Sequence, residues 1–203
     1  MNFNSELLKN LLSIYSPSGN ENNVREFIKS EIKDYVDEIE VDALGNLIVR
    51  KKGNGKKIMI SAHMDQIGLM VTNIDEKGFL RFTNVGGISP FVSLSQKVVF
   101  ENGVVGIIDS EPVEDIGKLK LENMYIDIGV FSKEEAESKI NIGDVCVYKT
   151  EYDENENVVS SKCLDDRVGC FVAIEAIKKI KDNVNDLYFV FTVQEEVGLR
   201  GAR

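Results

Sequence analysis

Two short apolar runs end abruptly at polar residues, although they stand far apart in the chain. The first, residues 57–62, ends directly at His63, and the second, residues 187–193, ends at Gln194-Glu195-Glu196. Runs of this kind are typical of buried central strands in a sheet covered by helices. Between them, from Leu69 to about Thr150, the sequence changes to short β-like runs separated by glycines. We therefore expect an α/β domain that is split in sequence by an inserted β-rich domain.

Helical spacing flanks this split. Apolar residues from Leu7 to Tyr15 share one helical face, which Pro17-Ser18-Gly19-Asn20 interrupts, and residues 24–35 repeat the spacing. A later helix is expected from about Arg167 to Lys181, after a polar loop at residues 151–157. The α/β domain should then comprise residues 1–68 and 158–203, with residues 69–157 as the insert. The glycine rhythm of the insert predicts a small barrel or sandwich, with one helix at residues 132–140 capped by Ser132.

Charge and cysteine content narrow the class of protein. The net charge is -10, with 34 acidic and 24 basic residues, which disfavours nucleic acid or an anionic membrane as a partner. Three cysteines without CxxC spacing indicate reduced thiols rather than a disulfide framework. Neither a signal peptide nor a long apolar span is apparent, so we expect a cytoplasmic protein.

Three acidic or histidine motifs follow the predicted strands or begin the later helix. They are His63-Met64-Asp65, Asp165-Asp166 and Glu195-Glu196. Each has an ordinary explanation, because a lone histidine is often structural and aspartates commonly cap a helix. Two neighbouring glutamates are harder to explain, since their charges repel and a cation would offset the repulsion. Together, these residue types suit a pair of divalent ions such as zinc, cobalt or manganese, with a nearby glutamate able to deprotonate a water.

These same motifs resemble those of a known enzyme family. Residues 61–68 (SAHMDQIG), 163–169 (CLDDRVG) and 193–202 (VQEEVGLRGA) resemble successive signatures of the M42 metallo-aminopeptidases, also called glutamyl aminopeptidases. Residues 42–46 (DALGN) and 125–129 (YIDIG) match further landmarks, so the resemblance runs along essentially the whole chain. It implies a phosphorylase/hydrolase-like α/β/α catalytic domain interrupted by a β-barrel-like dimerisation domain, and homo-oligomers formed through that insert.

The resemblance also implies a role for each site residue. His63 resembles the ligand of one ion, Asp165 the carboxylate that bridges two ions, and Glu196 the ligand of the second ion. Glu195 resembles the general base that activates water, and Asp65 the partner that orients His63. The implied reaction is removal of the N-terminal residue from a peptide substrate.

Family members continue beyond the position of Arg203, and each ion there takes one further ligand, an aspartate or a histidine. The metal site in this chain is therefore expected to be incomplete, with weak metal binding and negligible activity.

Two other functions are open at this point. A glycoside hydrolase of the endoglucanase type needs only two carboxylates, but it gives no role to His63 or Asp165. A non-catalytic oligomerisation module would use the insert alone. Loss of activity on adding a chelator would separate the peptidase from the glycosidase, and the size of the isolated insert would test the module.

Overall fold

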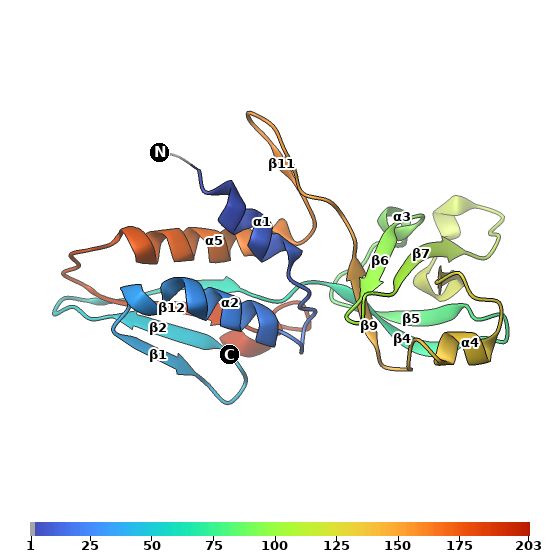
Figure 1. The fold of residues 1–203 in the computed structure, drawn as a ribbon, viewed down its shortest axis with the longest axis horizontal. Helices are drawn as coiled ribbons and strands as arrows, with labels where there is room; N and C mark the ends of the chain where they lie inside the picture. Colours follow the sequence, from blue (N-terminus) through green and yellow to red (C-terminus); the bar gives the residue numbers. More distant parts are fainter. Residues whose placement is uncertain (1–2) are drawn as a thin grey trace. The chain divides into compact units, whose positions relative to one another are not determined.

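The computed structural model describes residues 3–203 as two compact units (Figure 1). The sheet unit combines the residues up to Gln66 with Tyr152–Arg203, and the barrel unit is Ile67–Glu151. One unit is thus assembled from two separated stretches of chain and the other from the stretch between them. The catalytic and dimerising roles expected for these two parts stay predictions.

A four-stranded mixed sheet forms the centre of the sheet unit. Its strands are β1 (Glu38–Val41), β2 (Leu47–Lys51), β12 (Asp186–Thr192) and β3 (Lys57–His63), in that spatial order. β12 is antiparallel to β2 and parallel to β3, with Thr192 opposite His63. The second apolar run is therefore a central strand, as predicted, because it pairs on both sides and buries Phe189 and Phe191.

Three helices cover one face of this sheet. They are α1 (Ser5–Ser13), α2 (Asn22–Ile32), which continues into a 3-10 turn at Lys33–Tyr35, and α5 (Leu164–Lys179). Their apolar sides share one core with Leu47, Val49, Phe189 and Phe191 from the sheet. The helices predicted from apolar spacing are thus confirmed. A second helical layer, which the expected α/β/α stack requires, is not among the described residues, so that detail stays a prediction.

The first apolar run differs from its prediction. β3 lies at the edge of the sheet formed by residues 3–203, and β12 is the strand that pairs with it. Residues 57–61 are exposed, and Met59 keeps 70% of its surface accessible. The prediction was wrong because apolar composition reports that a strand can be buried, whereas its place in a sheet depends on which partners pair with it.

The barrel unit is a closed antiparallel barrel of six strands. In sequence they are β4 (Gly68–Ile74), β5 (Leu80–Val85), β6 (Lys97–Phe100), β7 (Val105–Ser110), β8 (Met124–Asp127) and β9 (Val145–Tyr148). They close in the order β4-β5-β8-β7-β6-β9 around an apolar interior. Gly106 is needed where two strands approach closely, because an added Cβ would lie 2.4 Å from the Ile126 side chain. The predicted choice between barrel and sandwich is therefore resolved as a barrel.

Short helices connect the barrel strands. α3 (Pro90–Ser93) follows β5, 3-10 turns lie at Ile116–Lys118 and Leu121–Asn123, and α4 (Lys133–Glu137) precedes β9. Ser132 caps α4, as expected, by accepting a hydrogen bond of 3.2 Å from the Glu135 amide. The Glu135 carboxylate in turn accepts from the Phe131 amide.

Some remaining features of the chain also bear on the predictions. The loop expected at residues 151–157 contains β10 (Asp153–Glu154), which pairs with β11 (Val159–Ser160) in a hairpin. A final 3-10 turn spans Arg200–Ala202.

All three cysteines are free thiols, as expected. None of the helices within residues 3–203 has the length and apolar character required to cross a membrane.

Candidate functional site

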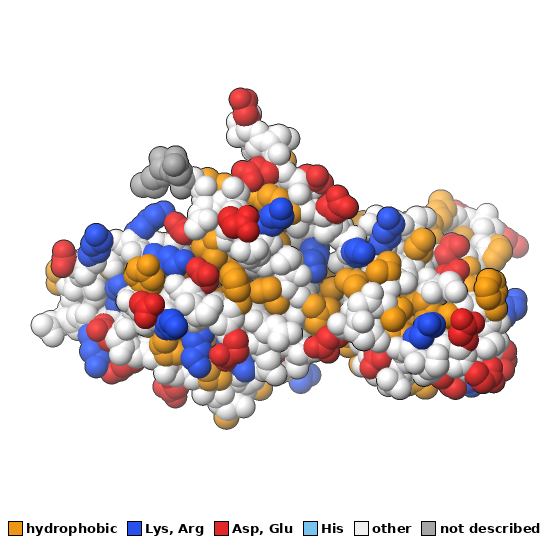
Figure 2. Space-filling view, in the orientation of Figure 1, with side chains coloured by type: hydrophobic (Ala, Val, Ile, Leu, Met, Phe, Trp, Pro, Cys, Tyr) orange, Lys and Arg blue, Asp and Glu red, His pale blue; other side chains and the backbone are white. Residues whose placement is uncertain are grey.

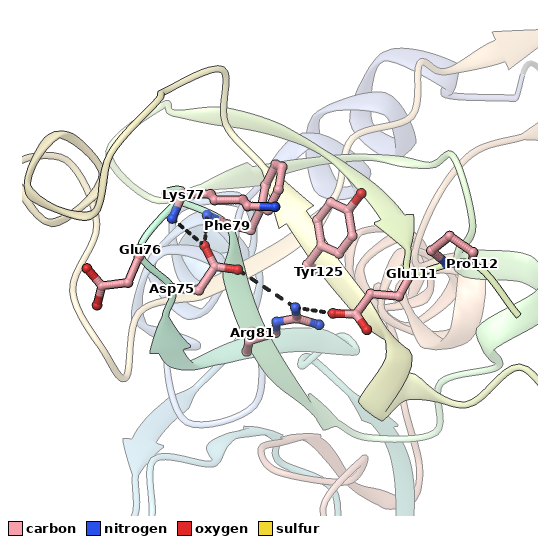
Figure 3. Close-up of a pocket in the computed structure, with 8 residues that line it drawn as sticks. All are labelled: Asp75, Glu76, Lys77, Phe79, Arg81, Glu111, Pro112 and Tyr125. Atoms are coloured by element: carbon pink, nitrogen blue, oxygen red, sulfur yellow. Dashed lines mark hydrogen bonds and ion pairs between the residues drawn. The ribbon is translucent and has the colours of Figure 1, made fainter.

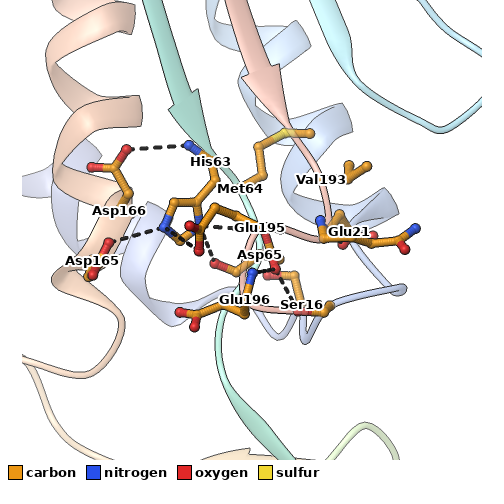
Figure 4. Close-up of polar contacts among 12 residues, drawn as sticks. Ser16, Glu21, His63, Met64, Asp65, Asp165, Asp166, Val193, Glu195 and Glu196 are labelled. Carbon is orange, nitrogen blue, oxygen red and sulfur yellow. Dashed lines mark hydrogen bonds and ion pairs between the residues drawn. The ribbon is translucent and has the colours of Figure 1, made fainter. Parts of the chain in front are cut away.

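The site lies at the carboxyl ends of the two parallel strands. β3 ends at His63 and β12 at Thr192, and the Met64 amide donates to the Thr192 carbonyl at 2.7 Å. This register places the residues after each strand at one edge of the sheet, where open α/β sheets gather their ligand-binding groups. Figure 4 shows the predicted residues of all three motifs converging there.

A histidine and two glutamates form a group of possible metal ligands. His63, Glu195 and Glu196 each offer one ligand atom, and these atoms all lie within 4.8 Å of one another. Asp165, from the start of α5, places its Oδ1 3.0 Å from His63 Nε2, and its side chain is 90% exposed. One imidazole and several carboxylates are a donor set that suits zinc, cobalt or manganese. The residues present therefore fit the expected divalent ions.

Carboxylates surround the imidazole of His63. Its Nδ1 lies 3.2 Å from the Asp65 carbonyl oxygen and 3.4 Å from Asp65 Oδ1, while Nε2 lies 3.8 Å from Glu195 Oε2. Burial lowers the pKa of His63, but the hydrogen bonds that the imidazole donates to Asp65 and Asp165 outweigh burial and raise the pKa to about 9. Without an ion, the imidazole is thus held in its charged form by the carboxylates around it.

Burial and like charges act on Glu196. Burial raises the pKa of Glu196, His63 opposes this effect, and the charges of Asp65, Glu195 and Asp165 raise it further. The repulsion expected from the sequence is therefore present in the folded chain. A bound cation would relieve it by favouring the ionised carboxylates.

Asp65 has more partners than the sequence predicted. It is completely buried, and its carboxylate accepts from the Ser18 hydroxyl at 2.5 Å and from the amides of Glu195 and Glu196 at 2.9 and 3.1 Å. Burial raises the pKa of Asp65, but the hydrogen bonds from His63, Ser18 and these amides lower it overall. Asp65 therefore contacts both His63 and the turn that carries the glutamates, which supports its expected orienting role.

The two aspartates at the start of α5 point to different partners. The peptide between them is cis, and both residues depart from helical backbone geometry. Asp166 accepts from the Gly169 amide at 3.0 Å and from the His63 amide at 3.3 Å, so it caps the regular helix and fastens the end of β3. Gly169 permits this contact, because a Cβ there would lie 2.4 Å from Asp166 Oδ1. Asp165 faces His63 instead.

Sequence reasoning gave no role to several residues that support the site. Arg167 is buried, and its guanidinium donates to the carbonyl oxygens of Met64 (2.8 Å) and Leu11 (2.6 Å) and to the Ser16 hydroxyl. Ser18 lies in the segment that was interpreted only as the end of a helix. Residues 16–18 pair with Gln66 in the fold, and nothing in the sequence indicates that these two distant segments meet.

Apart from this site, a pocket of about 490 Å³ lies on the barrel unit (Figure 3). The rings of Phe79 and Tyr125 are 4.4 Å apart there, and the Arg81 guanidinium lies over Tyr125. Arg81 also contacts the carboxylates of Glu111 at 2.5 Å and Asp75 at 3.7 Å. Two carboxylates of this pocket therefore share a cationic partner, in contrast to the carboxylates crowded around His63.

The fold and the site together define an α/β protein with a histidine-carboxylate centre of the kind that holds divalent ions in hydrolases. Residues 45–203 match the M42 glutamyl aminopeptidase family. The chain belongs to that family, and the resemblance found in the sequence is confirmed.

Known relatives extend this comparison. A candidate aminopeptidase of Acetivibrio thermocellus is 56% identical over 199 residues, which cover 98% of this chain and 60% of the relative. The solved TET1 peptidase of Pyrococcus horikoshii is 41% identical with a TM-score of 0.84, over 98% of this chain and 63% of that one. A solved endoglucanase of Thermotoga maritima is 38% identical with a TM-score of 0.82, over 92% and 58%. This chain spans about three fifths of the length of the curated relatives it matches.

Proposed function

We propose that this chain is the part of a metal-dependent aminopeptidase that carries His63, Asp165, Glu195 and Glu196. The observation that supports the proposal most directly is the group formed by His63, Glu195 and Glu196, whose ligand atoms lie within 4.8 Å of one another. His63, Asp165 and Glu196 are the residues that would hold two divalent ions. When bound, the ions would polarise the substrate carbonyl and lower the pKa of a water molecule.

In this proposal, the side chains of the chain have separate tasks. Glu195 is partly exposed and lies beside His63, so its carboxylate can take a proton from a water and pass it to the departing amine. Asp65 holds His63 and the amides of the glutamate turn together. The substrate would be a peptide with a free N-terminus, as the aminopeptidase names of the relatives suggest. A cytoplasmic location accords with the free cysteines.

Calorimetric titration with zinc, cobalt and manganese tests the metal site directly. We expect binding that the His63→Ala variant reduces by at least tenfold, because an inner ligand is lost. Asp186→Asn, at the opposite end of β12, is the matched control and should bind as the unaltered chain does. Equal binding by all three proteins would refute the metal site.

Hydrolysis of leucyl- and glutamyl-anilides, with and without chelator, tests the reaction itself. We expect the rate of this chain to be very low, because the described donor set supplies fewer ligands than two catalytic ions require. Any activity should disappear with chelator and in Glu195→Gln. Fast hydrolysis that survives the chelator would contradict the proposal.

The endoglucanase neighbour favours one alternative, glycoside hydrolysis. Retaining and inverting glycosidases hold their carboxylates about 5 Å or more apart, on either side of the scissile bond. Glu195 and Glu196 instead are neighbours on one turn, and glycoside hydrolysis gives no role to the His63 and Asp165 side chains beside them. We therefore rank peptide hydrolysis above it, and chelator-resistant cleavage of a glucan would reverse that order.

Assembly into homo-oligomers through the barrel unit is also part of the proposal. The Pyrococcus horikoshii TET1 peptidase can assemble into a tetrahedron or a large octahedral shell. The barrel unit exposes large apolar side chains, among them Phe131 at 93% and Val92 at 68%, and Figure 2 shows apolar side chains among charged ones on its surface. Sedimentation of the chain and of a Val92→Glu/Phe131→Glu variant should give a larger species for the first. A monomer in both cases would contradict assembly through these residues.

A further inference from the structure

The turn that carries Glu195 and Glu196 is held partly by its own backbone, because its carbonyl groups accept from amides at residues 198–201, and partly by side chains that accept from its amides. Four consecutive amides, from Val193 to Glu196, each donate to a side-chain oxygen. The acceptors are Asn46 Oδ1 for Val193 (3.0 Å), Glu21 Oε1 for Gln194 (3.1 Å), and the two carboxylate oxygens of Asp65 for Glu195 and Glu196 (2.9 and 3.1 Å). The turn thus begins where the backbone pairing between β2 and β12 stops. From Val193 on, side-chain oxygens take the place of the backbone carbonyl groups as acceptors.

The three acceptors come from three separate loops and are themselves buried. Glu21 and Asn46 are each 5% exposed, and Asp65 is fully covered. Glu21 also accepts from the Gly19 amide at 2.8 Å, which fixes its carboxylate within its own loop. We call Glu21, Asn46 and Asp65 the amide frame. Each member is oriented by further contacts, so the frame is a rigid surface against which the turn folds.

Both polar atoms of the Asn46 side chain form hydrogen bonds. Its Nδ2 donates to Asp42 Oδ2 at 2.7 Å and to the Gly201 carbonyl at 2.8 Å, while its Oδ1 accepts from Val193. Gly201 lies directly against it, because a Cβ there would be 2.4 Å from Asn46 Oδ1. Asn46 therefore joins the start and the end of the glutamate turn.

The backbone of the turn explains why such a frame is needed. Gln194 has a φ of 54°, which is an unfavourable conformation for a residue with a side chain. The ladder with β2 ends at Phe191 and the ladder with β3 ends at Thr192, so neither continues into residues 193–196. Without the side-chain acceptors, the four amides would lose these partners and only the bonds from residues 198–201 would hold the turn, so the carboxylates of Glu195 and Glu196 would be less firmly placed beside His63.

We propose that Glu21 and Asn46 are positioning residues which, together with Asp65, hold Glu195 and Glu196 at the His63 site. They do not touch His63 or the expected ions, and they act through the backbone of the turn. The consequence for metal affinity rests on the proposed function. The effect on the conformation of the turn does not rest on the proposed function, so the positioning role and the metal site can be refuted separately.

Amide hydrogen exchange of the full chain tests the frame without any metal. In Glu21→Ala, we expect the Gln194 amide to exchange about tenfold faster relative to Phe189 in the core, because one buried acceptor is lost. Glu21→Gln keeps a side-chain oxygen at the same place and should stay within about threefold of the unaltered chain. If Glu21→Ala does not fold, Glu21→Asp, which is one methylene shorter, gives the same comparison. Unchanged exchange of Gln194, or equal losses in the Ala and Gln variants, would overturn the proposal.

Zinc titration of the same variants provides the second readout. We expect Glu21→Ala and Asn46→Ala to bind about tenfold more weakly, as is usual when a residue that orients metal ligands is removed. The control is Asp186→Asn. Asp186 is a buried carboxylate at the start of β12, the strand that leads into the turn, but it pairs with Arg50 at 2.8 Å, so this variant should lose stability without losing zinc affinity. Equal affinity in the Glu21 and Asp186 variants would overturn the positioning role. If the unaltered chain binds no zinc while Glu21→Ala still loosens the turn, the proposed function fails and the frame stands.

Discussion

The sheet unit and the barrel unit bury very different kinds of side chain. Of the described residues, the sheet unit buries ten polar or charged ones, whereas the barrel unit buries Ser93 as its single example. The ten are Ser16, Glu21, Asn46, Lys51, His63, Asp65, Gln66, Arg167, Asp186 and Thr192. Burying polar groups is costly unless each finds a partner, so a fold retains many of them where they serve a site.

The barrel gains its order by another route. A closed ring of strands satisfies its own backbone, and its interior is filled by apolar residues such as Leu80 and Ile126. It needs no buried ionic network to define it. The stability of the sheet unit therefore depends on specific polar contacts, whereas that of the barrel depends on apolar packing.

The largest effect should come from Arg167. Replacing it by Met removes the donors to the Met64 and Leu11 carbonyls and to the Ser16 hydroxyl, leaving buried acceptors unpaired. We expect the free energy of unfolding to fall by about 3 kcal/mol or more. Urea denaturation measures this change. Arg81→Met in the barrel is the matched control, since that guanidinium is partly exposed, its partners Glu111 and Asp75 keep contact with solvent, and its loss should cost clearly less. Similar losses for both arginines would break the comparison.

A pH effect should come from the single histidine, which belongs to the sheet unit. Its pKa is raised from 6.5 to about 9 in the folded chain, so protonation stabilises the fold. This contribution is fully present below about pH 6.5 and is lost as the pH rises through about 9. With chelator present, we expect the free energy of unfolding to fall on the order of 2 kcal/mol across this window.

Thermal unfolding at a series of pH values measures the effect of His63. The His63→Gln variant should lack the part of the pH dependence that lies between about 6.5 and 9. If His63→Gln keeps the same pH dependence of stability, that dependence arises from other titratable groups. A flat profile in the unaltered chain would show that the carboxylates around His63 do not hold its proton.

The smallest effect should come from Ser93 in the barrel. Its hydroxyl donates to the Ser89 carbonyl at 2.7 Å and lies 2.6 Å from the Tyr148 hydroxyl. We expect Ser93→Ala to lower the free energy of unfolding by about 1 kcal/mol and to leave zinc binding unchanged. Tyr148→Phe removes the other half of the pair and is the natural companion variant. A change in zinc affinity from either substitution would mean that the barrel influences the site after all.

Much of the fold could be predicted because its signals are local. The helices at Ser5–Ser13 and Asn22–Ile32 follow from apolar spacing, and the cap of α4 follows from Ser132 and Glu135. The glycine-separated strands of the insert indicated a barrel or sandwich. The edge position of β3 could not be predicted, because it depends on pairing with β12, which lies far along the chain.

The site shows the same division between local and distant signals. His63, Asp165, Glu195 and Glu196 were found from their types and from their places beside strands and a helix start, and the structure brings them together. Their metal-binding and catalytic roles stay proposals. Glu21 stands in none of the motifs, and Asn46 entered only as the last residue of the 42–46 motif, with no role attached to it. Asn46 and Glu21 accept from amides 147 and 173 residues away, which only the three-dimensional arrangement reveals.

The interrupted layout of the sheet unit has a consequence for synthesis on the ribosome. All six barrel strands precede Glu151, so the barrel can close while the growing chain still lacks β12. During that interval, β3 has no parallel neighbour and β2 lacks its second partner. Domains generally fold as units in the order in which they emerge. The barrel should therefore form first, and the arrival of residues 186–196 should later give β3 its parallel neighbour and bring the two glutamates to His63.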